Sequence, residues 1–94
     1  MVSAFVLLNV ERQCIETIAD QLAGLKHVSE VYSVSGRYDL IAIVRVTTIE
    51  ELSTVVTHEL LKVNGITHSE TLLAFRAFSR HDLERLFSIG VDDA

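Results

Sequence analysis

Residues 28–46 read VSEVYSVSGRYDLIAIVRV, and this stretch determines the fold. Val28 to Ser35 and Leu40 to Val46 are both rich in β-branched side chains, which favour strands. Between them stands Gly36-Arg37-Tyr38-Asp39, a short link that begins with a glycine. Two strand-forming runs joined by so short a link predict an antiparallel β-hairpin.

The segments on either side of the hairpin each combine one strand with one amphipathic helix. Upstream, Ser3 to Val10 is a short apolar run typical of a buried strand, and residues 11–23 carry apolar side chains at helical spacing. Downstream, Thr48 to Glu51 is a capping-box pattern that opens a helix over 49–63, and residues 67–78 predict a fourth strand. A short helix over 80–89 is expected at the C-terminal end.

The order β-α-β-β-α-β predicts an α+β fold of the ferredoxin-like type. Right-handed crossovers place both helices on one face of a four-stranded antiparallel sheet. At 94 residues there is room for a single domain, taken here as 1–94.

Composition narrows the classes of partner. The net charge of −5 and the scattered Lys and Arg residues disfavour direct binding to nucleic acid, which needs clustered positive charge. The longest apolar runs are far shorter than the roughly 20 residues that span a membrane. With one cysteine, Cys14, and no basic leader at the N-terminus, a cytoplasmic location is expected.

Two of the predicted strands are apolar on both faces. Phe5 to Leu8 and Leu40 to Val44 place apolar side chains at consecutive positions, so these strands present apolar groups above and below the sheet. The helices cover only one face, and the other must meet a partner. A homodimer that packs sheet against sheet is therefore expected.

Catalytic and metal-binding patterns are weak. His58-Glu59 matches the start of the zinc-protease motif His-Glu-x-x-His, but Lys62 stands where the second histidine belongs. His27, His58, His68 and His81 have no ligand spacing, and Cys14 lies beside the apolar stripe of the first helix as a small hydrophobic residue would. We expect no enzyme activity, no metal and no cofactor.

The hairpin link is the best candidate for a binding site. A glycine can expose backbone N–H groups, which together with Arg37 could hold a carboxylate, while Asp39 could accept an ammonium group. The link would then hold both ends of a free amino acid. The alternative is a tight turn in which Asp39 bonds its own backbone. The residues alone leave both interpretations open.

From Phe5 to Phe78 the chain resembles the effector-binding domain of the Lrp/AsnC feast-famine transcription regulators. The features that carry the resemblance are Val28-x-x-Val31-x-x-Val34-x-Gly36-x-Tyr38-Asp39-Leu40 and the later Gly65-Ile66-x-x-Ser69-x-Thr71. The resemblance implies an amino-acid effector bound between dimers, and dimers that assemble further, commonly into an octamer. It also implies an effector site at Gly36, Tyr38, Asp39, Leu40, Ser69 and Thr71. Arg37 departs from the pattern and is included on electrostatic grounds.

Full-length members of that family carry a helix-turn-helix domain, whereas the first strand here begins at residue 3. The resemblance therefore implies a stand-alone sensing domain that binds amino acids or joins full-length Lrp/AsnC relatives. Two alternatives remain. One is a small enzyme of the dimeric α/β-barrel type, which would use sheet residues such as Asp39, Glu30, Glu70, Arg45, Arg76 and His68. The other is an ACT-like amino-acid-binding module that pairs through strand edges.

Overall fold

The computed structural model describes residues 1–78. Its strands are β1 (Val2–Val10), β2 (Val28–Ser33), β3 (Leu40–Val46) and β4 (Ile66–Leu73). Its helical elements are the 3-10 turn η1 (Arg12–Cys14), α1 (Ile15–Ala23), α2 (Ile49–Val55) and the π-helical turn η2 (Val56–Leu60). The predicted helix over 80–89 lies outside the described residues.

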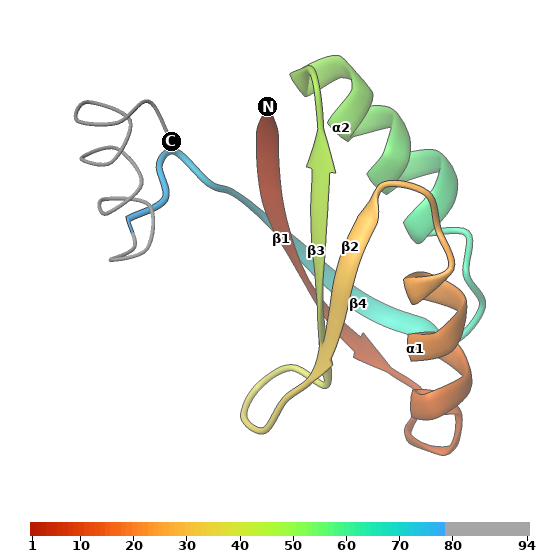
Figure 1. The fold of residues 1–94 in the computed structure, drawn as a ribbon. Coiled ribbons are helices and arrows are strands. Elements are labelled where there is room, and N and C mark those ends of the chain that lie inside the picture. Colours follow the sequence, from red (N-terminus) through yellow and green to blue (C-terminus); the bar gives the residue numbers. More distant parts are fainter. Residues whose placement is uncertain (79–94) are drawn as a thin grey trace, which may run out of the picture.

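The strands form one antiparallel sheet in the order β2-β3-β1-β4. Figure 1 shows α1 and α2 on the same side of the sheet, with α2 above α1. The ferredoxin-like α+β prediction is confirmed. Within residues 1–78, no segment forms a helix long and apolar enough to cross a membrane.

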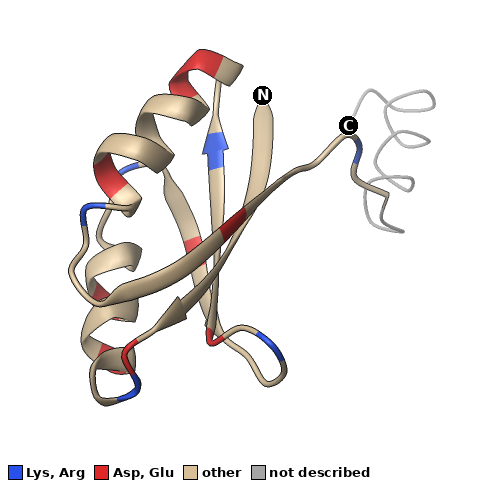
Figure 2. Cartoon of the chain, turned by 180° about the vertical axis from the view of Figure 1, so that it is seen from behind, with Lys and Arg blue, Asp and Glu red and all other residues tan. Residues whose placement is uncertain are grey.

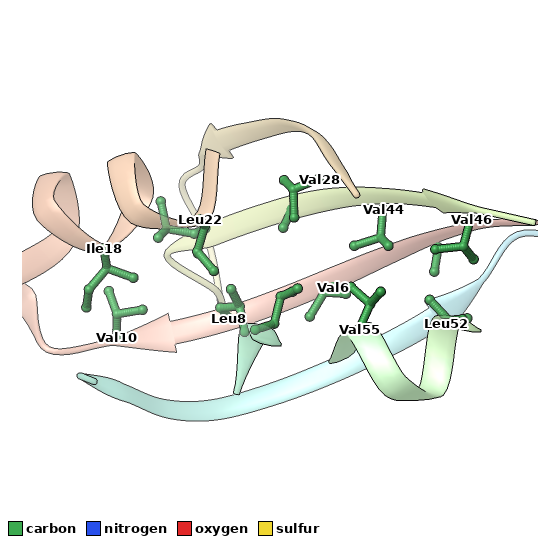
Figure 3. Close-up of a cluster of buried hydrophobic side chains, with 14 residues drawn as sticks. Val6, Leu8, Val10, Ile18, Leu22, Val28, Val44, Val46, Leu52 and Val55 are labelled. Atoms are coloured by element: carbon green, nitrogen blue, oxygen red, sulfur yellow. The ribbon is translucent and has the colours of Figure 1, made fainter. Parts of the chain in front are cut away.

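The core lies between the sheet and the two helices. Alternate residues of β1, namely Ala4, Val6 and Leu8, are fully buried, and they face Ile18 and Leu22 of α1 together with residues of α2 (Figure 3). Because successive side chains of a strand point to opposite faces, the intervening residues of β1 lie on the face without helices. We call that second surface the open face.

Both helices depart from the predicted regular form at one end. The first begins as a 3-10 turn, in which the Cys14 N–H donates to the Glu11 carbonyl at 2.9 Å, so that α-helix proper starts at Ile15. The second ends in a π-helical turn, in which the Leu61 N–H donates to the Val56 carbonyl at 3.0 Å. The helical region therefore stops at Leu60 rather than at residue 63.

Half of the predicted capping box is present. The Glu51 N–H donates to Thr48 Oγ1 at 3.0 Å, as the pattern requires. The Glu51 carboxylate accepts from the Thr47 N–H at 2.8 Å instead of from the Thr48 N–H, and from the Thr47 hydroxyl at 2.9 Å. The helix start is thus fixed by the residue before the N-cap as well as by the N-cap itself.

Two strands are shorter than predicted. β2 ends at Ser33 rather than Ser35, and β4 ends at Leu73 rather than Phe78. The Leu73 backbone pairs with Ala4, and the Ala74 N–H donates to the Ser3 carbonyl at 2.9 Å. The register would place Phe75 opposite Val2, where β1 begins, so β1 has no residue to pair with positions beyond Phe75.

Candidate functional site

The tip of the β2–β3 hairpin is open. Gly36 has φ 118°, a backbone conformation that side chains with a Cβ rarely adopt. A Cβ added there would have no neighbour within 4 Å, and both Gly36 and Arg37 are exposed. The backbone and the guanidinium group at the tip are therefore accessible to a solute.

The base of the hairpin is fastened to β1 through Asp39. The Asp39 N–H donates to the Leu8 carbonyl at 2.9 Å, and the Val10 N–H donates to Asp39 Oδ2 at 3.0 Å. The Asp39 carbonyl also accepts from the Val34 N–H at 3.0 Å, which closes the link. One carboxylate oxygen of Asp39 is therefore engaged, and its partner is a neighbouring strand rather than the turn's own backbone.

Tyr38 fastens the same hairpin to β4. Its ring stacks on His68, with centroids 6.2 Å apart and planes 16° apart, and its hydroxyl donates to Glu70 Oε1. The hydrogen bond to Glu70 raises the pKa of the Tyr38 phenol above 10.0, and desolvation and the negative charge of Glu70 raise it further, while Arg37 acts in the opposite sense. Sequence reasoning gave neither His68 nor Glu70 a place in this site.

Strand register decides which of the predicted β4 residues join the hairpin. Glu70 pairs with Leu7 on the open face, whereas Ser69 and Thr71 pair with the buried Leu8 and Val6. Directly opposed residues of an antiparallel pair point to the same face, so Ser69 and Thr71 lie on the helix side of β4. The structure therefore brings Tyr38 to His68 and Glu70 and places Ser69 and Thr71 on the opposite face.

Leu40, the remaining predicted site residue, is fully buried at the start of β3. Its side chain belongs to the core.

The open face forms a second candidate surface. Phe5 lies between Ile43 and Leu72 in the register, and Leu7 pairs with Ile41. Phe5 keeps 39% of its surface exposed and Leu72 keeps 45%. The strands carry few charged residues, as Figure 2 shows, and those few, Glu30, Arg45 and Glu70, lie on the open face around this apolar patch. An apolar patch with few charges is the kind of surface that another protein chain covers.

Within residues 1–78 no group of three or more His, Cys, Asp or Glu side chains could hold a metal ion. A cavity of about 180 Å³ lies at the end of the sheet remote from the hairpin, lined by Met1, Ser3 and residues 74–77, which include no carboxylate or imidazole. Cys14 is half-buried against the core.

Comparison with known proteins defines the family. Residues 3–83 match the model of the Lrp/AsnC ligand binding domain. The chain belongs to this family. The predicted resemblance to the Lrp/AsnC effector-binding domain is therefore confirmed.

Individual relatives are moderately similar. TTHA0845 of Thermus thermophilus, a crystal structure, is 46% identical with a TM-score of 0.79, and the match covers 85% of this chain and 100% of that one. An HTH-type transcriptional regulator of Pyrococcus horikoshii is 30% identical over 76 residues, which are 78% of this chain and 51% of the regulator. The chain thus spans about half the length of the curated relatives it matches.

Two further solved structures share the fold at lower identity. A transcriptional regulator of Neisseria meningitidis in complex with L-Met is 16% identical with a TM-score of 0.75, and the match covers 84% of this chain and 53% of that one. A feast or famine regulatory protein of M. tuberculosis complexed with L-methionine is 19% identical with a TM-score of 0.72, with coverage of 84% and 53%. At these identities the likeness concerns the fold alone.

Proposed function

We propose that this chain is an effector-binding module that takes a free amino acid at the β2–β3 hairpin. The ligand-binding description of its family and the L-methionine complexes of two regulators with the same fold support an amino-acid effector. The observation that carries the proposal is the hairpin itself, whose tip is exposed at Gly36 and Arg37 while its base is fixed to two strands. A fixed base lowers the entropic cost of binding at the tip.

In this proposal the residues of the hairpin tip and those of its base have different roles. The Gly36 backbone and the Arg37 guanidinium receive the carboxylate of the amino acid, since both are accessible and donate hydrogen bonds. Tyr38, Asp39 and the buried Leu40 hold the hairpin in place. Ser69 and Thr71 meet the effector's side chain around the free edge of β4, which is an edge strand.

We further propose that two copies of the chain pair through the apolar patch of their open faces, and that such pairs assemble to higher oligomers. The apolar patch of Phe5, Ile43 and Leu72 supports this pairing. Full-length Lrp/AsnC relatives are proposed as additional partners, because they share this domain. The family match favours a regulatory role over the alternatives of a barrel-type enzyme and an ACT-like module.

A thermal-shift screen against the twenty standard amino acids at millimolar concentration tests effector binding. An amino acid at 100 times its Kd adds about 2.7 kcal/mol of stability, and each kcal/mol raises the Tm by roughly 4–8 °C in a domain of this size. Arg37→Ala should reduce the shift, and Arg12→Ala, which removes an exposed arginine from η1, should leave it unchanged. A folded wild-type protein that responds to none of the twenty contradicts the proposal.

A further inference from the structure

Two carboxylates lie at the hairpin, and they are engaged in different ways. Asp39 accepts from the Val10 backbone N–H while its own N–H donates to Leu8, so it is part of the join between the hairpin and β1. Glu70 is exposed, and the partner that the structure shows for its carboxylate is the Tyr38 hydroxyl. Asp39 is half-buried and its carboxylate is held by a backbone donor of β1, whereas Glu70 is exposed and its carboxylate is held by a side-chain hydroxyl, so the Glu70 carboxylate is the more accessible of the two.

We propose that Glu70, and not Asp39, receives the ammonium group of the bound amino acid, in exchange for the Tyr38 hydroxyl. The inference rests on the proposed function and names the residue that recognises one end of the effector. Arg37 and Glu70 then form a complementary pair of charges for a zwitterion, the cation at the hairpin tip and the anion on β4.

Replacing the Tyr38 hydroxyl by an ammonium group gives the Glu70 carboxylate a stronger hydrogen-bond donor. A phenol–carboxylate hydrogen bond has a neutral donor, whereas an ammonium–carboxylate hydrogen bond has a charged one, and bonds between charged partners are stronger. The raised pKa of the Tyr38 phenol, caused first by the hydrogen bond from its hydroxyl to Glu70, means that Tyr38 stays a neutral donor near pH 7. Tyr38 therefore holds the Glu70 carboxylate in a defined position until a stronger donor arrives.

The molecule contains a similar tyrosine–glutamate pair away from the hairpin tip. Tyr32 donates to Glu30 on β2, also on the open face and also on an edge strand. The chemistry of the two pairs is the same, but Tyr32 and Glu30 both lie on β2, whereas Tyr38 joins the hairpin link to Glu70 on β4. Glu30→Gln is therefore a control for any general effect of removing a carboxylate from the open face.

The amino acid that gives the largest thermal shift with the wild-type protein is used as the probe, together with the same molecule lacking its α-amino group. Calorimetric titration then measures the binding of both compounds to the wild type, Glu70→Gln and Glu30→Gln. Glu70→Gln should raise the Kd of the amino acid at least tenfold and leave the Kd of the des-amino compound unchanged. Glu30→Gln should change neither. Unchanged far-UV circular dichroism shows that each variant is folded.

The outcomes separate the two proposals. If no amino acid binds the wild type, the proposed function fails and this inference fails with it. If an amino acid binds and Glu70→Gln binds it equally well, the inference alone is overturned. An equal loss of affinity for the des-amino compound also overturns it, because Glu70 would then act on another part of the effector.

Discussion

The two faces of β1 carry similar side chains and meet different surroundings. Ala4, Val6 and Leu8 are fully buried under the helices, while Phe5 between them keeps 39% of its surface exposed on the open face. Apolar character therefore does not distinguish the faces, and coverage by α1 and α2 does. It follows that one face supplies the stability of a single chain, while the other is available to a second molecule.

The strongest effect is expected on the covered face. Leu8→Ala removes a fully buried side chain, and such changes lower the free energy of unfolding by about 2–5 kcal/mol. Leu7→Ala is the matched variant, since it changes the same residue type one position away on the open face, where burial is partial. Urea denaturation at one fixed protein concentration measures both. Equal losses in the two variants at a concentration where the protein is monomeric would contradict the difference between the faces.

The second prediction concerns the open face. Phe5→Arg places a charge at the centre of the apolar patch, between Ile43 and Leu72, and a buried charge without a partner opposes association strongly. We expect the dissociation constant of the homodimer to rise by at least a hundredfold, as measured by analytical ultracentrifugation. Ser53→Arg, an exposed position on α2, should sediment like the wild type. A wild-type protein that remains monomeric at millimolar concentration would remove the basis for this prediction.

The third prediction compares two glycines with positive φ. A Cβ on Gly65 would lie 2.6 Å from Cδ1 of Ile18 in the core, whereas a Cβ on Gly36 would meet nothing within 4 Å. Alanine at either position costs about 1–3 kcal/mol from the backbone. Gly65→Ala should be the more destabilising of the two in thermal unfolding, because Ile18 must also move. The opposite ranking would show that the backbone at Gly36 is more tightly constrained than the backbone at Gly65.

The smallest expected effect is a pH dependence of stability that arises from Glu51 at the start of α2. Hydrogen bonds from the backbone N–H and the hydroxyl of Thr47 lower the pKa of Glu51 below 4.5, and the charge of nearby His27 lowers it further. A lowered pKa in the folded state adds stability above the unfolded value, and this stability is lost as pH falls below about 4.5 and through the folded value. Glu51→Gln should therefore lose less stability than the wild type between about pH 5 and about pH 3, the range in which glutamate side chains titrate.

Glu50→Gln, in the same helical turn, is the control for that measurement and should follow the wild-type curve. Identical pH profiles of Glu51→Gln and the wild type would show that the Thr47 bonds do not depend on the charge of Glu51.

Hydrophobic pattern and local caps were sufficient to predict most of the fold. The strand over Leu40–Val46 and the Thr48 cap follow from residues near one another in the sequence, and both are present. The ends of β4 and of the second helical region were not predictable in this way. The end of β4 depends on how far its pairing with β1 continues, and the end of the second helical region depends on a π-helical turn that changes the residue spacing.

The candidate site was predictable only in part. Gly36 and its neighbours predict a turn by composition, but the partners of Asp39 and Tyr38 lie on β1 and β4, far along the chain. Whether Ser69 or Glu70 faces the hairpin depends on the register of β4, and a shift of one residue reverses the answer. Sequence spacing alone does not fix that register.

The strand order also implies a sequence of folding events. Within residues 1–78, β2 and β3 are the only sheet neighbours that follow one another along the chain, because Val6 of β1 pairs with the distant Ala42 and Thr71. Short loops close at lower entropic cost than long ones, so the hairpin is the strand pair that can form first, and the slower β1 pairings must be added to it. The segment proposed to recognise the effector is thus also the segment on which the sheet is assembled.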